Sequence, residues 1–257
     1  TLEHYPMANG VVMDGPEWGY EMAPHHMNHR SYFFNDLPEA VEPMAKDLGY
    51  DYAAMVAAKD RLLNRFHNLE PKRIRSNARG GIVGAYRILG ADADLMAWLS
   101  FRCETLTRNF RHVREGVAAH LDRPVRMGCG PRSAAFAPLC GYDFVDLAEF
   151  MDFLLPKHYF FHRGFDGFIG TVYRYAQTLM EWNPRLRVSD TLEVVQALFG
   201  IILPGVEDDM LDFESALSPE FFEQVVTQET KRAIAAVDDP ERIVPWLDTG
   251  RFPHDGD

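Results

Sequence analysis

The sequence predicts an α/β fold built on parallel strands. Short apolar runs alternate with long stretches of helical periodicity over 257 residues, which is typical of strands joined by crossover helices. Four runs end at polar or glycine-containing segments and cover residues 10–15, 125–130, 153–160 and 243–248, with a fifth candidate at 201–204. Prolines inside the third and fourth runs predict that regular strand pairing is interrupted there.

Helices are expected in the intervals between these strands. The clearest covers residues 92–120, because apolar residues recur there at helical spacing: Leu95, Leu99, Cys103, Leu106, Phe110, Val113 and Val117. Shorter helices are expected at 52–66, 166–182, 191–199 and 219–237. The last has a good start signal in Ser218 followed by Pro219.

The uneven spacing of the strands predicts three regions. About a hundred residues separate the first two strands, far more than one crossover helix needs. We therefore expect a first strand and active-site loop at 1–34, a helical insertion at 35–90, and the remaining βα units at 91–257. The ends, 1–4 and 252–257, resemble cuts through a longer protein.

Composition excludes several classes of protein. The formal net charge of −12 argues against a nucleic-acid partner, and no apolar run approaches the roughly 18 residues of a membrane span. Three cysteines without a paired spacing favour a reducing compartment, and hence the cytoplasm. The glycine fingerprints of dinucleotide and nucleoside triphosphate sites are missing, so no cofactor is expected.

Reactive side chains follow each predicted strand. Functional residues of parallel α/β folds gather just past the carboxyl ends of the strands. We therefore expect these groups to line one cleft at that edge of the sheet. The expected substrate-binding residues are Trp18, Tyr20, His25, Arg132, Lys157, His158, Tyr159 and Trp246. We expect Asp14, Lys157, His158 and Asp248 to converge.

Asp14 is the most informative of these residues. It ends an apolar strand and precedes Gly15, which allows a ligand to approach the backbone closely. Such a carboxylate suits a nucleophile, although an Asp before Gly-Pro also forms turns. Glu17 lies beside Trp18, an environment that suits a general acid, although a solvated loop position is the alternative.

Histidines could form either a metal site or a polar lining. His25 and His29 are four residues apart, a spacing that can bind zinc on a helix, but Pro24 and Asn28 indicate a loop. His158 is a further donor. We expect no metal and interpret the histidines as hydrogen-bonding groups.

The strand ends resemble a known family of enzymes. Residues 9–17, Asn-Gly-Val-Val-Met-Asp-Gly-Pro-Glu, resemble a strand end of the TIM-barrel hypothetical glycosyl hydrolases related to β-galactosidases and α-L-fucosidases. Residues 155–159 and 244–248 resemble later strands of such barrels. The likeness covers about a third of the chain. It implies a (β/α)8 TIM-barrel-like fold, here incomplete because four or five strands cannot close a barrel of eight.

The resemblance also implies a catalytic function. Asp14 would be the nucleophile, and the acid/base would be one of Glu17, Glu21 and Asp248, because Arg132 stands where many such enzymes carry a carboxylate. The sequence thus predicts a glycosidase acting on a carbohydrate with two carboxylates. Two alternatives remain: a metal-dependent hydrolase of amidohydrolase type using His25, His29, His158 and Asp248, and a non-catalytic carbohydrate-binding relative.

Overall fold

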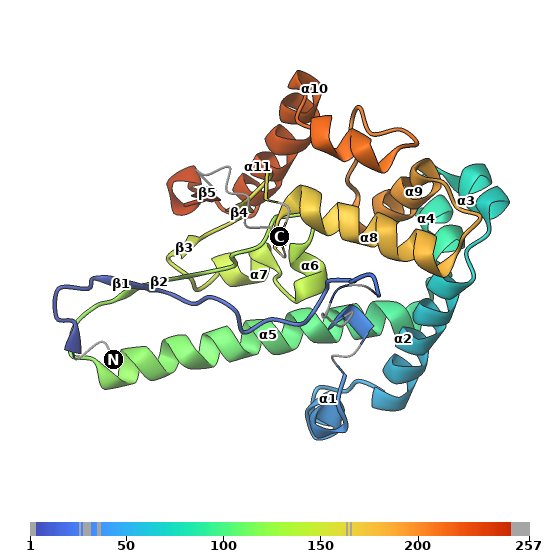
Figure 1. Cartoon of the computed structure of the whole chain (residues 1–257). Coiled ribbons are helices and arrows are strands. Elements are labelled where there is room, and N and C mark those ends of the chain that lie inside the picture. The colour runs from blue at the N-terminus through green and yellow to red at the C-terminus, as the bar shows by residue number, and fades with distance from the viewer. Residues whose placement is uncertain are drawn as a thin grey trace.

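Helices make up most of the chain in the computed structural model (Figure 1), which describes residues 4–25, 27, 32–34, 37–162, 164 and 166–247. The α-helices are α1 Glu42–Asp47, α2 Tyr52–His67, α3 Pro71–Asn77, α4 Gly81–Leu89, α5 Ala93–His120, α6 Ala137–Cys140, α7 Phe144–Ala148, α8 Phe168–Trp182, α9 Val188–Phe199, α10 Pro219–Phe221 and α11 Thr227–Ile234. A π-helical turn, Phe222–Val226, joins α10 to α11. Short 3-10 turns occupy Tyr32–Phe34, Glu39–Val41, Met210–Ser215 and Pro240–Arg242.

The strands are short and all of their pairings are parallel. They are β1 Gly10–Val12, β2 Arg126–Cys129, β3 Phe153–Leu154, β4 Lys157–His158 and β5 Trp246–Leu247. The pairs are β1 with β2, β2 with β3, and β4 with β5. Leu154 also bridges to Ile243, so the two small sheets adjoin. Pro156 separates β3 from β4, as predicted, because proline has no N–H to donate to a neighbouring strand.

The prediction of a TIM-barrel-like fold is wrong. The described residues form mostly helix, and their five strands of two to four residues make sheets ordered β1-β2-β3 and β4-β5. The fifth candidate at 201–204 is not a strand: residues 201–203 are irregular and lead from α9 into a turn that begins at Pro204. An apolar run by itself does not distinguish a strand from a buried loop. The prediction of a barrel came from the resemblance of the strand ends to those of TIM-barrel enzymes.

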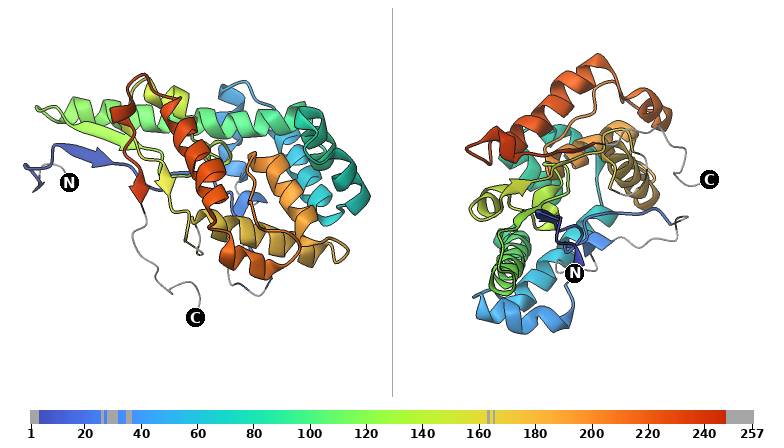
Figure 2. Two further views of the ribbon diagram at one scale, coloured as in Figure 1. Left: turned by 90° about the horizontal axis from the view of Figure 1, so that it is seen from above. Right: turned by 90° about the vertical axis from the view of Figure 1, so that its left-hand side faces the viewer.

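Helix α5 matches its prediction closely. It begins after Asp92, whose side chain accepts a hydrogen bond from the Leu95 N–H at 2.8 Å, so the first turn is capped. Its apolar face buries Leu95, Leu106 and Phe110. Figure 2 shows this helix running along the molecule, with the strands toward one end and α2, α3 and α4 toward the other.

The helices within 35–90 pack against the rest of the chain. Helix α2 lies along α5, and α3 and α4 contact α9. Buried residues of these helices, including Met55, Phe66 and Ile88, belong to the same hydrophobic cluster as residues of α5 and α8. These helices therefore share a core with the sheet region.

The final helical segment begins where the sequence indicates. The Ser218 hydroxyl accepts a hydrogen bond from the Phe221 N–H at 3.2 Å, and Pro219 occupies the first turn. Among the described residues, no helix is both long enough and apolar enough to cross a membrane.

Two helical glycines are expected to respond in opposite ways to alanine. At Gly84 in α4, an added Cβ would overlap the backbone carbonyl oxygen of Asn77, whereas at Gly116 in α5 nothing lies within 4 Å. Gly116→Ala should raise the free energy of unfolding by roughly 0.5–1 kcal/mol, because alanine favours helix. Gly84→Ala should lower it by about 1–3 kcal/mol through overpacking. Urea unfolding of both variants checks this. Equal stabilisation by both would contradict the close packing of α3 on α4.

Candidate functional site

A cluster of charged side chains lies where the strands end. Glu17 follows β1, Arg132 follows β2, Lys157 lies in β4, and Asp166 precedes α8. β1, β2 and β3 are parallel, so the residues that follow them lie at one edge of that sheet, where ion pairs join Glu17 to Arg132, Arg132 to Asp166, and Asp166 to Lys157. We call these four residues the strand-end cluster.

Arg132 is the centre of the strand-end cluster. Its guanidinium Nη2 pairs with Glu17 Oε1 and lies 3.2 Å from Asp166 Oδ1. Nη1 donates to the Pro131 carbonyl at 2.8 Å. The Arg132 side chain is only 7% exposed, so its charge needs these carboxylates. Among the described residues, Arg132 Nε and Glu17 Oε2 are buried without a hydrogen-bond partner.

Lys157 brings a second buried cation into the cluster. Its Nζ lies 3.3 Å from Asp166 Oδ2, 5.2 Å from the Tyr159 ring centroid and 5.9 Å from that of Trp246. Burial lowers the pKa of Lys157, and the charge of Arg132 lowers it further. The carboxylates of Asp166 and Asp14 act in the opposite direction.

Asp14 is the exposed carboxylate of this region. It lies two residues beyond β1 and its side chain faces solvent, whereas Glu17 is largely buried beneath Arg132. The charge of Asp14 raises the pKa of Lys157, in the direction opposite to the effect of burial. Asp14 is therefore available to a ligand, whereas Glu17 Oε1 is already occupied by Arg132.

A second ion pair lies beneath the cluster. Glu21 Oε1 accepts hydrogen bonds from Arg174 Nη2 at 2.8 Å and from the Thr171 hydroxyl at 2.6 Å. Both members of the ion pair are nearly inaccessible to solvent. The Asp166 N–H also donates to Glu21 Oε1 at 3.3 Å, so this pair positions Asp166.

The predicted aromatic residues divide between ligand-facing and packing positions. Tyr159 and Trp246 are half-buried and flank Lys157. Tyr20 is buried, with the Arg132 guanidinium 5.8 Å from its ring. The Trp18 indole packs toward α5, where Nε1 donates to the Arg102 carbonyl at 3.1 Å. Trp18 is thus placed to hold the loop after β1.

The predicted convergence of Asp14, Lys157, His158 and Asp248 stays a prediction. Asp14 acts on Lys157 only through its charge, which raises the pKa of the amine, and Asp248 and His29 lie outside the described residues. His158 is buried, and its ring packs on Phe160 with centroids 5.1 Å apart. The His25 N–H donates to Glu181 Oε2 at the far end of α8.

The positions of His25 and His158 concern the alternative function, a metal-dependent hydrolase. No group of three or more His, Cys, Asp or Glu side chains within the described ranges is arranged to hold a metal ion. His25 and His158, the two described members of the proposed histidine set, make the separate contacts given above.

The sequence places Asp166 among the polar residues after the third predicted strand but indicates neither its pairing with Arg132 and Lys157 nor the pairing of Glu21 with Arg174. Asp166 has a positive φ of 72°, which is uncommon for a residue other than glycine and is often associated with functional positions. The local signal was its place between Gly164 and Gly167. Nothing local indicated that Glu21 would pair with a residue 153 positions away.

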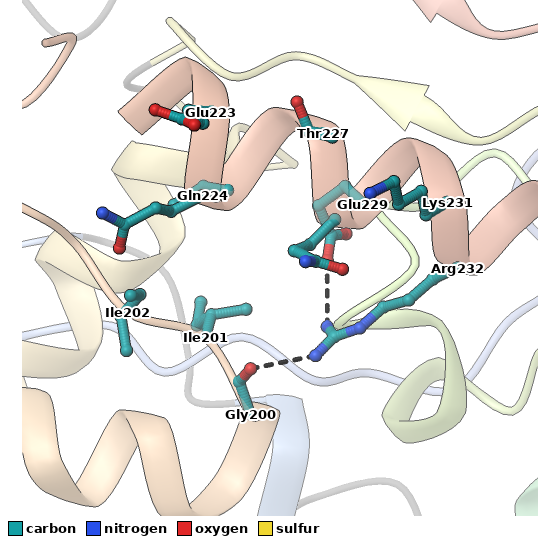
Figure 3. Close-up of a pocket in the computed structure, with 11 residues that line it drawn as sticks. Gly200, Ile201, Ile202, Glu223, Gln224, Thr227, Glu229, Lys231 and Arg232 are labelled. Carbon is teal, nitrogen blue, oxygen red and sulfur yellow. Dashed lines mark hydrogen bonds and ion pairs between the residues drawn. The ribbon is translucent and has the colours of Figure 1, made fainter. Parts of the chain in front are cut away.

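A separate groove of about 710 Å³ lies between the segment after α9 and the last helices. Figure 3 shows Arg232 linking two of its walls: Nη1 bonds Glu229 at 3.0 Å, and Nη2 bonds the Gly200 carbonyl at 3.0 Å. Glu229 also accepts the Ala135 N–H at 2.8 Å. This buried carboxylate therefore anchors the segment that follows Arg132.

Removal of Glu21 should be strongly destabilising. Glu21→Ala leaves Arg174 buried without its main counter-charge, which should lower the free energy of unfolding by roughly 3–5 kcal/mol. The double change Glu21→Met with Arg174→Met should cost less, because no charge is left unpaired. Urea unfolding checks both. As a matched control, Asp208→Ala in the exposed Arg187–Asp208 pair should cost less than about 1 kcal/mol.

His158 should make stability depend on pH. Burial lowers its pKa from the ordinary value of 6.5, so below about pH 6.5 the unfolded chain binds a proton that the folded chain resists. The free energy of unfolding should therefore fall as pH drops through this range. Comparing wild type with His158→Phe by urea unfolding at several pH values should show a smaller fall in the variant. Parallel curves would contradict the assignment.

Comparison with known protein families, curated proteins and solved structures finds no match for this chain. The roles given to the strand-end cluster therefore depend on its own geometry and chemistry.

Proposed function

We propose that this protein hydrolyses a glycosidic bond in a carbohydrate, with Asp14 as the nucleophilic carboxylate. The observation that supports this is the surroundings of Lys157, whose amine lies 3.3 Å from Asp166 and near the rings of Tyr159 and Trp246, and whose pKa is raised by the charge of Asp14. Sugars combine hydroxyl groups with apolar C–H faces. A carboxylate, an ammonium and an indole at one edge match both features.

The charged groups would have different roles in such a site. Glu17 and Asp166 are both engaged by buried cations, so their role is to hold Arg132 and Lys157 in place. Lys157 and Trp246 would contact the sugar. The second catalytic carboxylate is assigned to Asp248, which follows Leu247 directly in the sequence.

The reaction follows the two-carboxylate scheme. Asp14 attacks the anomeric carbon as the carboxylic acid protonates the departing oxygen, which forms a glycosyl ester and releases the alcohol. Water then attacks the anomeric carbon of this ester, the second carboxylate takes a proton from the water, and the Asp14 carboxylate leaves. The net change is one glycosidic bond cleaved by one water molecule.

Asp14→Asn tests this proposal. Asparagine keeps the size and turn preference of Asp14 but is not a nucleophile, so hydrolysis of an aryl glycoside should fall by at least about 10³-fold. The melting temperature should be unchanged, because Asp14 is exposed. Activity should be measured over a panel of aryl glycosides, together with thermal unfolding.

Asp122→Asn is the matched control. Asp122 is also an exposed loop aspartate, but it precedes β2 and so lies at the opposite end of that strand. Its activity should match wild type. Retained hydrolysis in Asp14→Asn, or sugar binding by wild type without any hydrolysis across the panel, would contradict the proposal.

A further inference from the structure

We infer that Lys157 is a nucleophilic lysine that forms an imine with the carbonyl group of a small aldehyde or ketone, such as an open-chain sugar. This inference does not depend on the proposed glycoside hydrolysis, because it concerns an amine that hydrolysis uses only as a hydrogen-bond donor.

The burial of Lys157 separates it from three of the other lysines; the fourth, Lys59, has a side chain 15% exposed, and its amine donates to the Phe34 carbonyl at 3.1 Å. The sequence contains five lysines, Lys46, Lys59, Lys72, Lys157 and Lys231. Lys157 has a side chain only 7% exposed, whereas Lys46, Lys72 and Lys231 are exposed. Imine-forming lysines need this kind of partly apolar enclosure, which favours the neutral amine over the ammonium.

The groups that face Lys157 come from several elements. Arg132 follows β2, Asp166 precedes α8, Asp14 follows β1, and the Tyr159 and Trp246 ring centroids lie 5.2 Å and 5.9 Å from the amine. Burial and the Arg132 charge lower the pKa of Lys157, and the two carboxylates only partly offset them. A larger fraction of this amine is therefore neutral near pH 7 than of an exposed lysine.

Asp166 supplies the proton transfers that the reaction requires. Neutral Nζ attacks the carbonyl carbon, so a C–N bond forms and the C=O π pair moves to oxygen. Asp166, 3.3 Å from Nζ, takes a proton from the nitrogen and returns it to the oxygen, giving a carbinolamine. Loss of water then gives the imine, so amine plus carbonyl yields imine plus water without an oxidant or reductant.

Reductive trapping of the full chain tests this inference. The protein is incubated near pH 7 with glycolaldehyde and sodium cyanoborohydride, which converts an imine into a stable secondary amine. Peptide mapping by mass spectrometry then gives the labelling rate of each lysine. We expect Lys157 to be labelled about tenfold or more faster than Lys46, Lys72 and Lys231, although it is far less exposed.

Two further measurements make the result decisive. In concentrated urea Lys157 should be labelled no faster than the exposed lysines, because its reactivity depends on the folded strand-end cluster. In the Lys157→Met variant the fast labelling should be absent, and the other lysines should be labelled at the wild-type rate. If Lys157 in the folded wild type is labelled no faster than the exposed lysines, the inference is overturned. That outcome says nothing about Asp14, whose role is measured separately by glycoside hydrolysis.

Discussion

The short segment after β1 is held by three buried cations, and the arrangement of the molecule around the sheet edge depends on them. Arg132 pairs with Glu17, Arg102 donates to the Gly19 carbonyl, and Arg174 pairs with Glu21. These arginines come from the loop after β2, from α5 and from α8. Five consecutive residues thus tie the sheet to helices on different sides of the core.

Burying these charges imposes a strict condition on the fold. Arg102 is fully buried, with its guanidinium 5.0 Å from the Trp98 ring and 5.3 Å from the Phe33 ring. A buried cation is tolerated only when carbonyls, carboxylates and ring faces surround it. The packing of α5, the path of residues 17–21 and the position of α8 must therefore all be correct together, which favours one arrangement of the chain.

The same condition gives the strand-end cluster its chemistry. Once Glu17 and Asp166 pair with Arg132 and Lys157, Asp14 is left as the exposed carboxylate, and Lys157 is a buried amine near two aromatic rings. Asp166 is itself held by Glu21 through its backbone N–H. The Glu21–Arg174 pair and the strand-end cluster are consequently parts of one network, so the positions of Arg132 and Lys157 depend on interactions that stabilise the fold.

The sequence by itself determined the local features: α5 from its apolar spacing and the Asp92 cap, the helix start at Ser218 and Pro219, the parallel strands, and the interruption at Pro156. Such signals lie within a few residues of one another, so they survive without knowledge of the fold. Only the tertiary structure decided that the strands form small open sheets and not a barrel, that Trp18 turns toward α5, and that Asp166 bridges two cations. Glu17 and Arg132 are 115 positions apart, and the pairing of distant charges depends on three-dimensional packing that no local pattern encodes.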